Sequence, residues 1–198
     1  AKIAATTDVI SGGRLDFGIG AGWNEYEHTS MGIPLYKPGE RIRRLDEACK
    51  LIKLLWTQSI ADFAGDYYQL NQARCEPKPI QRPWPPFVIG GSGERLTLRV
   101  VARHADIWNF SGRSVEDFTH KLDVLRRHCQ EIGRDLSEIV ASIQYPANYE
   151  DLAQTREAIA RFIEAGARHV VVMLTPPYPE RIASRIAQEV IAPLVEAR

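Results

Sequence analysis

The segment Pro86–Arg95 has the sequence PFVIGGSGER, in which a short apolar run leads into three glycines. The apolar part is typical of a buried strand, and the apolar residues that follow, from Leu96 to Ala102, have helical spacing. A turn from a strand into a helix leaves unpaired backbone N–H groups at the positive end of the helix dipole, where an anion is stabilised. Because glycine also lets the backbone approach a phosphate closely, we predict a phosphate site at Gly90, Gly91, Ser92 and Gly93. The alternative is a plain turn in which Ser92 caps the helix.

The same order of strand and helix repeats along the rest of the chain. Strands are predicted near 86–90, 105–110, 138–145 and 168–174, and helices near 93–103, 114–132, 151–165 and 179–196. Strands that alternate with long helices indicate a parallel sheet. The nearly continuous apolar run in 168–174 is typical of a strand that is covered on both faces.

The first part of the chain is less regular. A helix ends near Ser11–Gly13, a strand is predicted at 14–20, and an amphipathic helix follows a loop at 41–57. Residues of about 58–85 form an insertion, with a hairpin around Gly65-Asp66 and a proline-rich stretch. An insertion of this length is either a lid or a surface excursion. Because the chain starts at Ala1 within a helical pattern, we expect one domain over 1–198 that is part of a longer protein.

Two architectures accommodate these elements. One is a complete five-stranded doubly wound sheet. The other is an eight-stranded barrel, which typically takes about 250 residues and would lack its first three strands here. The start within a helix favours the barrel. In both, ligands bind at the carboxyl ends of the strands, where 20–25, 90–93, 108–110 and 144–146 would meet.

Composition excludes several classes of protein. The chain has 25 Lys plus Arg and 25 Asp plus Glu, so no basic excess points to nucleic acid. Its three cysteines are widely spaced without a C-x-x-C pair, so neither disulfides nor a metal site are predicted. No apolar run approaches the roughly 20 residues that span a bilayer. We expect a cytoplasmic protein that does not bind membranes.

Residues 11–27, SGGRLDFGIGAGWNEYE, strongly resemble the middle segment of the bacterial-luciferase-like flavin and deazaflavin oxidoreductases. Gly39-Glu40-Arg41, Gly65-Asp66-Tyr67-Tyr68, the proline-rich stretch, Ile89–Gly93 and Ala105–Asn109 follow the pattern of that family in the same order. The GWNEYE form of the loop is most similar to the branch that uses coenzyme F420.

The resemblance implies an α/β fold, a (β/α)8 barrel of which this chain holds the fourth strand to the eighth helix. It also implies F420, or alternatively FMN, bound across the carboxyl face of the barrel, with the phosphate of the cofactor at the glycine loop, Gly90–Gly93. The cofactor-binding residues would be Gly20, Ala21, Gly22, Trp23, Asn24, Gly90, Gly91, Ser92, Gly93 and Asn109.

The function so implied is hydride transfer between F420 and a small organic substrate. Glu25 and His28 are the candidates for proton transfer, although Glu25 could simply satisfy backbone groups and His28 could be an exposed polar residue. Trp23 and Trp108 are candidates to stack on the cofactor ring. Arg95 could pair with the phosphate or lie on a helix surface.

Two other functions stay open. One is an FMN-dependent monooxygenase, and the other is a cofactor-free interaction module derived from the barrel. The substrate-side residues of the family lie largely on the three strands that this chain would lack, so we expect the isolated chain to be inactive. The full-length protein is expected to be a homodimer.

Overall fold

The computed structural model describes residues 1–196, which form a five-stranded parallel sheet covered by helices. The strand order is β1-β4-β5-β6-β7, and each neighbouring pair is parallel. The strands are β1 (Phe17–Ile19), β4 (Phe87–Gly90), β5 (Ile107–Phe110), β6 (Val140–Pro146) and β7 (His169–Met173). The order never reverses, whereas a doubly wound sheet reverses at its switch point. The doubly wound alternative is therefore wrong.

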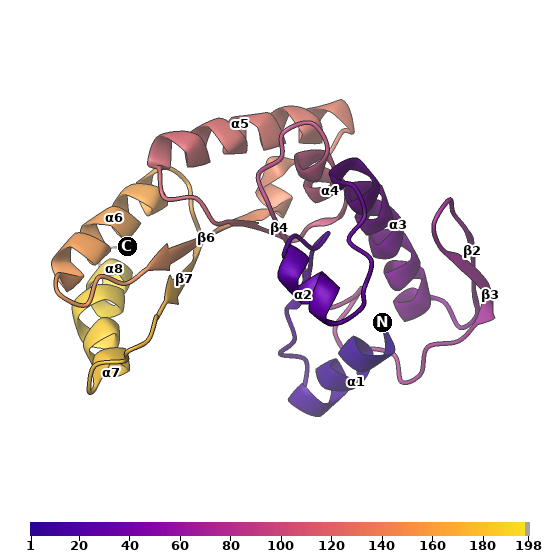
Figure 1. The fold of residues 1–198 in the computed structure, drawn as a ribbon, viewed down its shortest axis with the longest axis horizontal. Helices are drawn as coiled ribbons and strands as arrows, with labels where there is room; N and C mark the ends of the chain where they lie inside the picture. Colours follow the sequence, from indigo (N-terminus) through magenta and orange to yellow (C-terminus); the bar gives the residue numbers. More distant parts are fainter. Residues whose placement is uncertain (197–198) are drawn as a thin grey trace.

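The longer helices between successive strands lie along the outer side of the sheet, so that the chain forms an open arc (Figure 1). The N-terminus lies in one arm of this arc and the C-terminus in the other (Figure 1). The helices are α1 (Lys2–Ser11), α2 (Glu25–Ser30), α3 (Pro38–Thr57), α4 (Thr97–His104), α5 (Val115–Glu131), α6 (Leu152–Glu164), α7 (Ile182–Ile186) and α8 (Ala192–Glu196). A short 3₁₀ turn, Leu136–Glu138, precedes β6, and a π-helical turn, Ala187–Ile191, joins α7 to α8.

The predicted alternation of strands and helices is confirmed after Pro86. Along the whole chain, three details of the predicted elements differ from the structure. The helix predicted from residue 93 begins at Thr97, because 94–96 form a turn closed by the Leu98 N–H on the Gly93 carbonyl at 3.0 Å. The predicted loop before α3 contains α2, whose first turn is capped by the Asn24 side chain. The helix predicted over 179–196 consists of three short segments and begins at Ile182.

The core between sheet and helices is rich in aromatic residues. Trp108, Phe110, Phe118 and Phe162 are all fully buried, and the rings of Trp108 and Phe118 are stacked with centroids 5.7 Å apart. A second group places Phe17 edge-on to Trp56 and Phe87. These large side chains fix how the helices lie on the strands and so position the carboxyl ends of the sheet.

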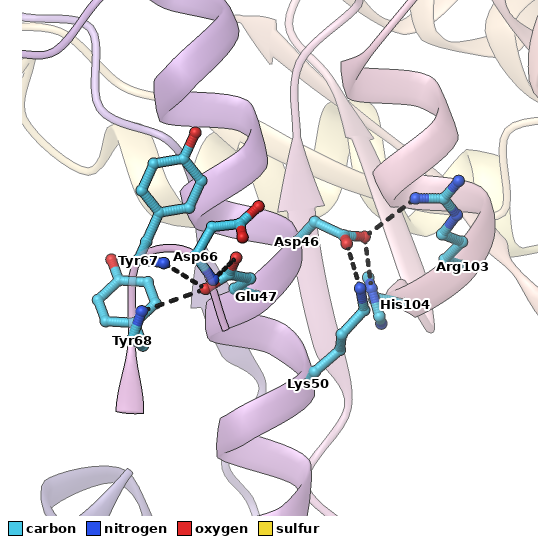
Figure 2. Close-up of polar contacts among 8 residues, drawn as sticks. All are labelled: Asp46, Glu47, Lys50, Asp66, Tyr67, Tyr68, Arg103 and His104. Carbon is cyan, nitrogen blue, oxygen red and sulfur yellow. Dashed lines mark hydrogen bonds and ion pairs between the residues drawn. The ribbon is translucent and has the colours of Figure 1, made fainter. Parts of the chain in front are cut away.

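The insertion is anchored on the outside of α3. Its hairpin pairs β2 (Ala61–Ala64) with β3 (Gln69–Ala73) in antiparallel fashion, as predicted around Gly65-Asp66. The Glu47 carboxylate accepts backbone N–H bonds from Asp66, Tyr67 and Tyr68 at 2.8, 3.0 and 3.2 Å (Figure 2).

The proline-rich stretch is fixed by a buried carboxylate of α1. Asp8 accepts hydrogen bonds from the backbone N–H of Ile80 and of Gln81, at 2.8 and 3.0 Å, and its side chain is fully buried. The insertion is thus bound to two helices at separate points.

Within 1–196, no helix has the length and apolar composition that crossing a membrane would require.

Candidate functional site

A cavity of about 610 Å³ lies at the carboxyl ends of four strands. It is formed by the loop after β1, the ends of β4 and β5, and the side chain of Gln144 on β6. Seven of the ten predicted cofactor residues line it, namely Gly20, Ala21, Gly22, Trp23, Gly90, Gly91 and Asn109. Ile42, Thr97 and Ser111 complete the lining with Gln144. Residues of the insertion do not line this cavity.

A second cavity, of about 490 Å³, adjoins the first. The two share Ile42 and Thr97, and the second contains Ser92 and Gly93 of the glycine loop. The loop thus runs between the two cavities, so one extended ligand could reach both. The tenth predicted residue, Asn24, lines neither, because its Oδ1 accepts the backbone N–H of Glu27 at 3.3 Å as the cap of α2.

The glycine loop is shaped around the side chain of Thr97. A Cβ added to Gly91 would lie 2.9 Å from Thr97 Cγ2, and one added to Gly93 would lie 2.7 Å from Thr97 Oγ1. Gly91 also has a φ of +118°, which side-chain-bearing residues rarely adopt. Gly91 is therefore required by this loop conformation, and a side chain at Gly93 would force Thr97 to move.

The backbone N–H groups of the loop are not equivalent. Gly91 N–H donates to the carbonyl oxygen of Asn109 at 3.3 Å, so it is occupied. By contrast, the N–H groups of Ser92 and Gly93 meet no protein acceptor among the described residues. These two donors are therefore available to an anion.

Charged side chains surround the second cavity. Arg95 is exposed at its wall, and Lys121 reaches it from α5. The Lys121 ammonium lies 2.6 Å from the Glu94 carboxylate, whose hydrogen bond raises the lysine pKa. Lys121 was not predicted, because only tertiary structure brings it to a loop more than twenty residues away in sequence. No sequence signal distinguishes it from the other lysines.

The loop after β1 is held in shape from outside the main cavity. Arg41 on α3 donates to the carbonyl oxygen of Gly22 at 2.5 Å. The His28 ring packs on the same glycine, since a Cβ there would lie 2.7 Å from His28 Nε2. With a φ of +75°, Gly22 is another position that requires glycine.

The two candidates for proton transfer do not line the main cavity. His28 lines another cavity of about 260 Å³ with Tyr36 and Arg41, which shares Gly20 and Ala21 with the main cavity, and its Nδ1 is buried there without a partner among the described residues. Glu25 is exposed in the first turn of α2 and lines neither of these cavities. The structure does not bring the pair together at the main cavity, and their catalytic role stays a prediction.

The two candidate stacking tryptophans have opposite environments. Trp23 is 83% exposed and lines the main cavity. Trp108 is fully buried on the helix side of β5 and donates its indole N–H to Gly91, so the prediction that it stacks on a cofactor is wrong. Neighbouring side chains of a strand point to opposite faces, and it is Asn109 that faces the cavity.

A polar cluster ties α3 to α4 on the outer surface (Figure 2). Asp46 lies 2.9 Å from His104 Nε2, 3.3 Å from Arg103 and 2.5 Å from Lys50. The hydrogen bond from His104 holds the pKa of Asp46 well below its usual range. Burial lowers the pKa of His104, against the opposing effect of Asp46. The cluster joins the helix before the glycine loop to the helix after it and is a structural contact.

Residues 1–196 contain no group of three His, Cys, Asp or Glu side chains that could hold a metal ion. Fold and site together define an α/β protein with a cavity, its candidate ligand site, at the carboxyl ends of a parallel sheet. The profile of the luciferase-like monooxygenases matches residues 1–190, and the chain belongs to this family.

Similar proteins include one that is named as FMNH2-dependent and one, a solved structure, that is named as F420-dependent. An uncharacterized protein of Mycobacterium tuberculosis is 32% identical over 195 residues, covering 94% of this chain and 64% of the relative. An FMNH2-dependent dimethylsulfone monooxygenase of Pseudomonas putida is 36% identical over 126 residues, covering 64% of this chain and 34% of the enzyme. The chain thus spans less than two thirds of either relative.

The solved structure of an F420-dependent secondary alcohol dehydrogenase superposes with a TM-score of 0.81 at 18% identity, covering 98% of this chain and 73% of the dehydrogenase chain. This likeness confirms the α/β luciferase-like fold.

Proposed function

We propose that the intact protein is an oxidoreductase that transfers a hydride between coenzyme F420 and a small organic substrate. The observation that carries the proposal is the main cavity, where the loop after β1, the glycine loop and Asn109 meet at the carboxyl ends of the strands. The choice of F420 rests on the GWNEYE sequence at residues 22–27.

The residues present fit a phosphorylated, ring-containing cofactor. Ser92 and Gly93 offer free N–H groups, and Arg95 adds positive charge beside them, whereas the charge of Lys121 is paired with Glu94 in the same wall. The adjoining main cavity offers Trp23, Asn109 and Gln144 to the remainder of the ligand. When bound, the cofactor supplies the hydride chemistry, and these residues bind and orient it.

The protein groups proposed to move a proton are Glu25 and His28. Both follow the loop after β1, and the buried Nδ1 of His28 is unpartnered among the described residues. A role in proton transfer requires α2 to approach the substrate side of the main cavity in the intact protein. Asn24 would act by capping α2.

We also propose that the sheet is part of a (β/α)8 barrel, of which β1 and β4 to β7 here supply the fourth to eighth strands. In support, β1 and β7 are the two edge strands and the strand order runs in one direction. On this proposal the isolated chain is inactive and the remaining strands complete the substrate site. Homodimeric assembly and a cytoplasmic location stay predictions.

The second candidate function is an FMN-dependent monooxygenase. A specific observation favours it, because the Pseudomonas putida relative at 36% identity is named as FMNH2-dependent. The fold and the phosphate site would be shared, and the two functions would differ in the groups that face the ring.

Two reactions of the intact protein distinguish these functions. The F420 proposal predicts a change in F420 absorbance with members of a panel of small alcohols and carbonyl compounds. The monooxygenase function predicts that reduced FMN consumes oxygen at a rate that depends on both the protein and the substrate. A matched Gly91→Ala protein, altered in the loop, is the control for both. Absence of both reactions and of cofactor binding would favour the non-enzymatic interaction module.

A further inference from the structure

A row of polar side chains crosses three strands of the sheet on the face opposite Trp108. Asn109 of β5 is in register with Ser142 of β6, which is in register with His169 of β7. Asn109 is itself in register with Gly90 of the glycine loop. The row therefore begins at the main cavity and ends at the edge strand.

These side chains are joined by consecutive hydrogen bonds. Gln144 Nε2 donates to Asn109 Oδ1 at 2.5 Å, and Asn109 Nδ2 donates to Ser142 Oγ at 2.9 Å. Ser142 Oγ lies 2.8 Å from His169 Nδ1. Ser142 is fully buried and Asn109 is 8% exposed, so an unpaired polar group on either of these two side chains would carry a full desolvation cost.

The number of protons fixes the direction of the chain. Ser142 has one hydroxyl proton, and its oxygen already accepts from Asn109. The oxygen has a second lone pair, but His169 Nδ1 is the acceptor that lies within hydrogen-bond distance of that proton among the described residues, and it accepts only when it carries no proton of its own. If Nδ1 were protonated, Ser142 Oγ would accept from both neighbours, and its buried proton would find an acceptor only if the amides of Asn109 and Gln144 turned over.

We propose that His169, acting through Ser142, is a positioning residue that fixes the polarity of the two amides. In this state Gln144 uses its N–H on Asn109, which leaves Oε1 as the acceptor that it can offer to the cavity it lines. The inference rests on the proposed function, in which the cavity holds a flavin or deazaflavin. Both rings carry an imide N–H, which is the class of donor that Oε1 would accept.

The first test is the tautomer of His169 in the intact protein. Long-range proton–nitrogen correlation spectra of protein labelled with ¹⁵N-histidine at pH 8, where an ordinary histidine is neutral, distinguish the two ring nitrogens. The expected result is an unprotonated Nδ1 and a protonated Nε2. A protonated Nδ1 at His169 would overturn the inference.

The second test uses a matched pair of variants at His169 in the intact protein. His169→Asn retains an acceptor oxygen near the position of Nδ1, whereas His169→Ala removes it. His169→Ala is expected to shift the side-chain amide signals of Asn109 and Gln144 and to weaken F420 or FMN binding about 3- to 10-fold. His169→Asn is expected to restore both. Unchanged amide signals in His169→Ala would contradict the inference.

The two proposals fail separately. Wild-type protein that shows the expected tautomer and amide signals but binds neither cofactor would contradict the proposed function, while the hydrogen-bonded chain would stand. Cofactor binding with the opposite tautomer would contradict only the positioning role of His169.

Discussion

The indole Nε1 of Trp108 donates a 2.9 Å hydrogen bond to the carbonyl oxygen of Gly91. This bond links the buried aromatic cluster to the loop that offers free N–H groups to an anion. The carbonyl oxygen of Asn109 binds the same glycine through its N–H. Two successive residues of β5 thus hold both the N–H and the carbonyl group of Gly91.

Replacing Trp108 by Phe is expected to loosen this loop. The substitution removes the indole donor and part of a fully buried ring, so the free energy of unfolding should fall by roughly 1–3 kcal/mol. Denaturant unfolding measures the loss. Trp23→Phe is the control, because Trp23 is 83% exposed and its replacement should change stability by less than about 0.5 kcal/mol. Equal stability of the two variants would show that the buried indole of Trp108 and its hydrogen bond contribute little to the free energy of unfolding.

Replacing Gly91 by Ala is expected to weaken cofactor binding at least 10-fold. The new Cβ would lie 2.9 Å from Thr97 Cγ2 at a backbone φ of +118°. Adding Thr97→Ser removes the clashing methyl group and should restore part of the affinity.

The control for that experiment is Gly18→Ala, since a Cβ at Gly18 meets no atom within 4 Å. Titration with F420 and with FMN measures all four proteins. If Gly91→Ala binds as tightly as wild type, the loop does not contact the phosphate.

Acid is expected to destabilise the contact between α3 and α4. Burial lowers the pKa of His104, so the folded state resists protonation of the imidazole. The contribution of the neutral imidazole to the free energy of unfolding is fully present above about pH 6.5 and declines as the pH falls below that value. The lowered pKa of Asp46 adds stability above about pH 4, which is lost only in strong acid.

Denaturant midpoints between pH 5 and pH 8 test the histidine contribution. His104→Gln should flatten the dependence on pH over this range. The exposed His120→Gln is the matched control and should leave the slope as in wild type. An equal slope in wild type and His104→Gln would rule out His104 as its source.

The three cysteines are expected to be unreactive in the folded protein. Cys49, Cys75 and Cys129 are at most 1% exposed, and burial raises the pKa of Cys49 to about 12. Because the thiolate is the reactive form, a disulfide reagent such as DTNB should react slowly with native protein and rapidly with three thiols per chain after unfolding. Rapid native reaction would mean that the helices around Cys49 open readily.

Much of the fold could be predicted from local sequence. The alternation of strands and helices after Pro86 follows from apolar spacing and glycine stops, and the hairpin follows from Gly65-Asp66. α2 was missed because its six residues are too few for a periodic pattern, and only the cap at Asn24 signals it. The start of α4 was misplaced because the turn at 94–96 has the same apolar spacing as a helix.

The site was predicted less completely, for a physical reason. Glycine-rich segments at strand ends are visible in sequence, and the structure brings most of them to one cavity. Which of Trp108 and Asn109 faces that cavity depends on the pleat of β5, and local composition does not fix it. Lys121 and the row through Ser142 and His169 depend on helix packing and strand register, which only the folded chain defines.

The central claim is tested most directly by paired fluorescence titrations of the intact protein with F420 and with FMN. The account predicts saturable one-to-one binding with a preference for F420, weakened by Gly91→Ala. A preference for FMN would contradict the F420 assignment and favour the monooxygenase. Binding of neither cofactor would contradict the proposed oxidoreductase function itself.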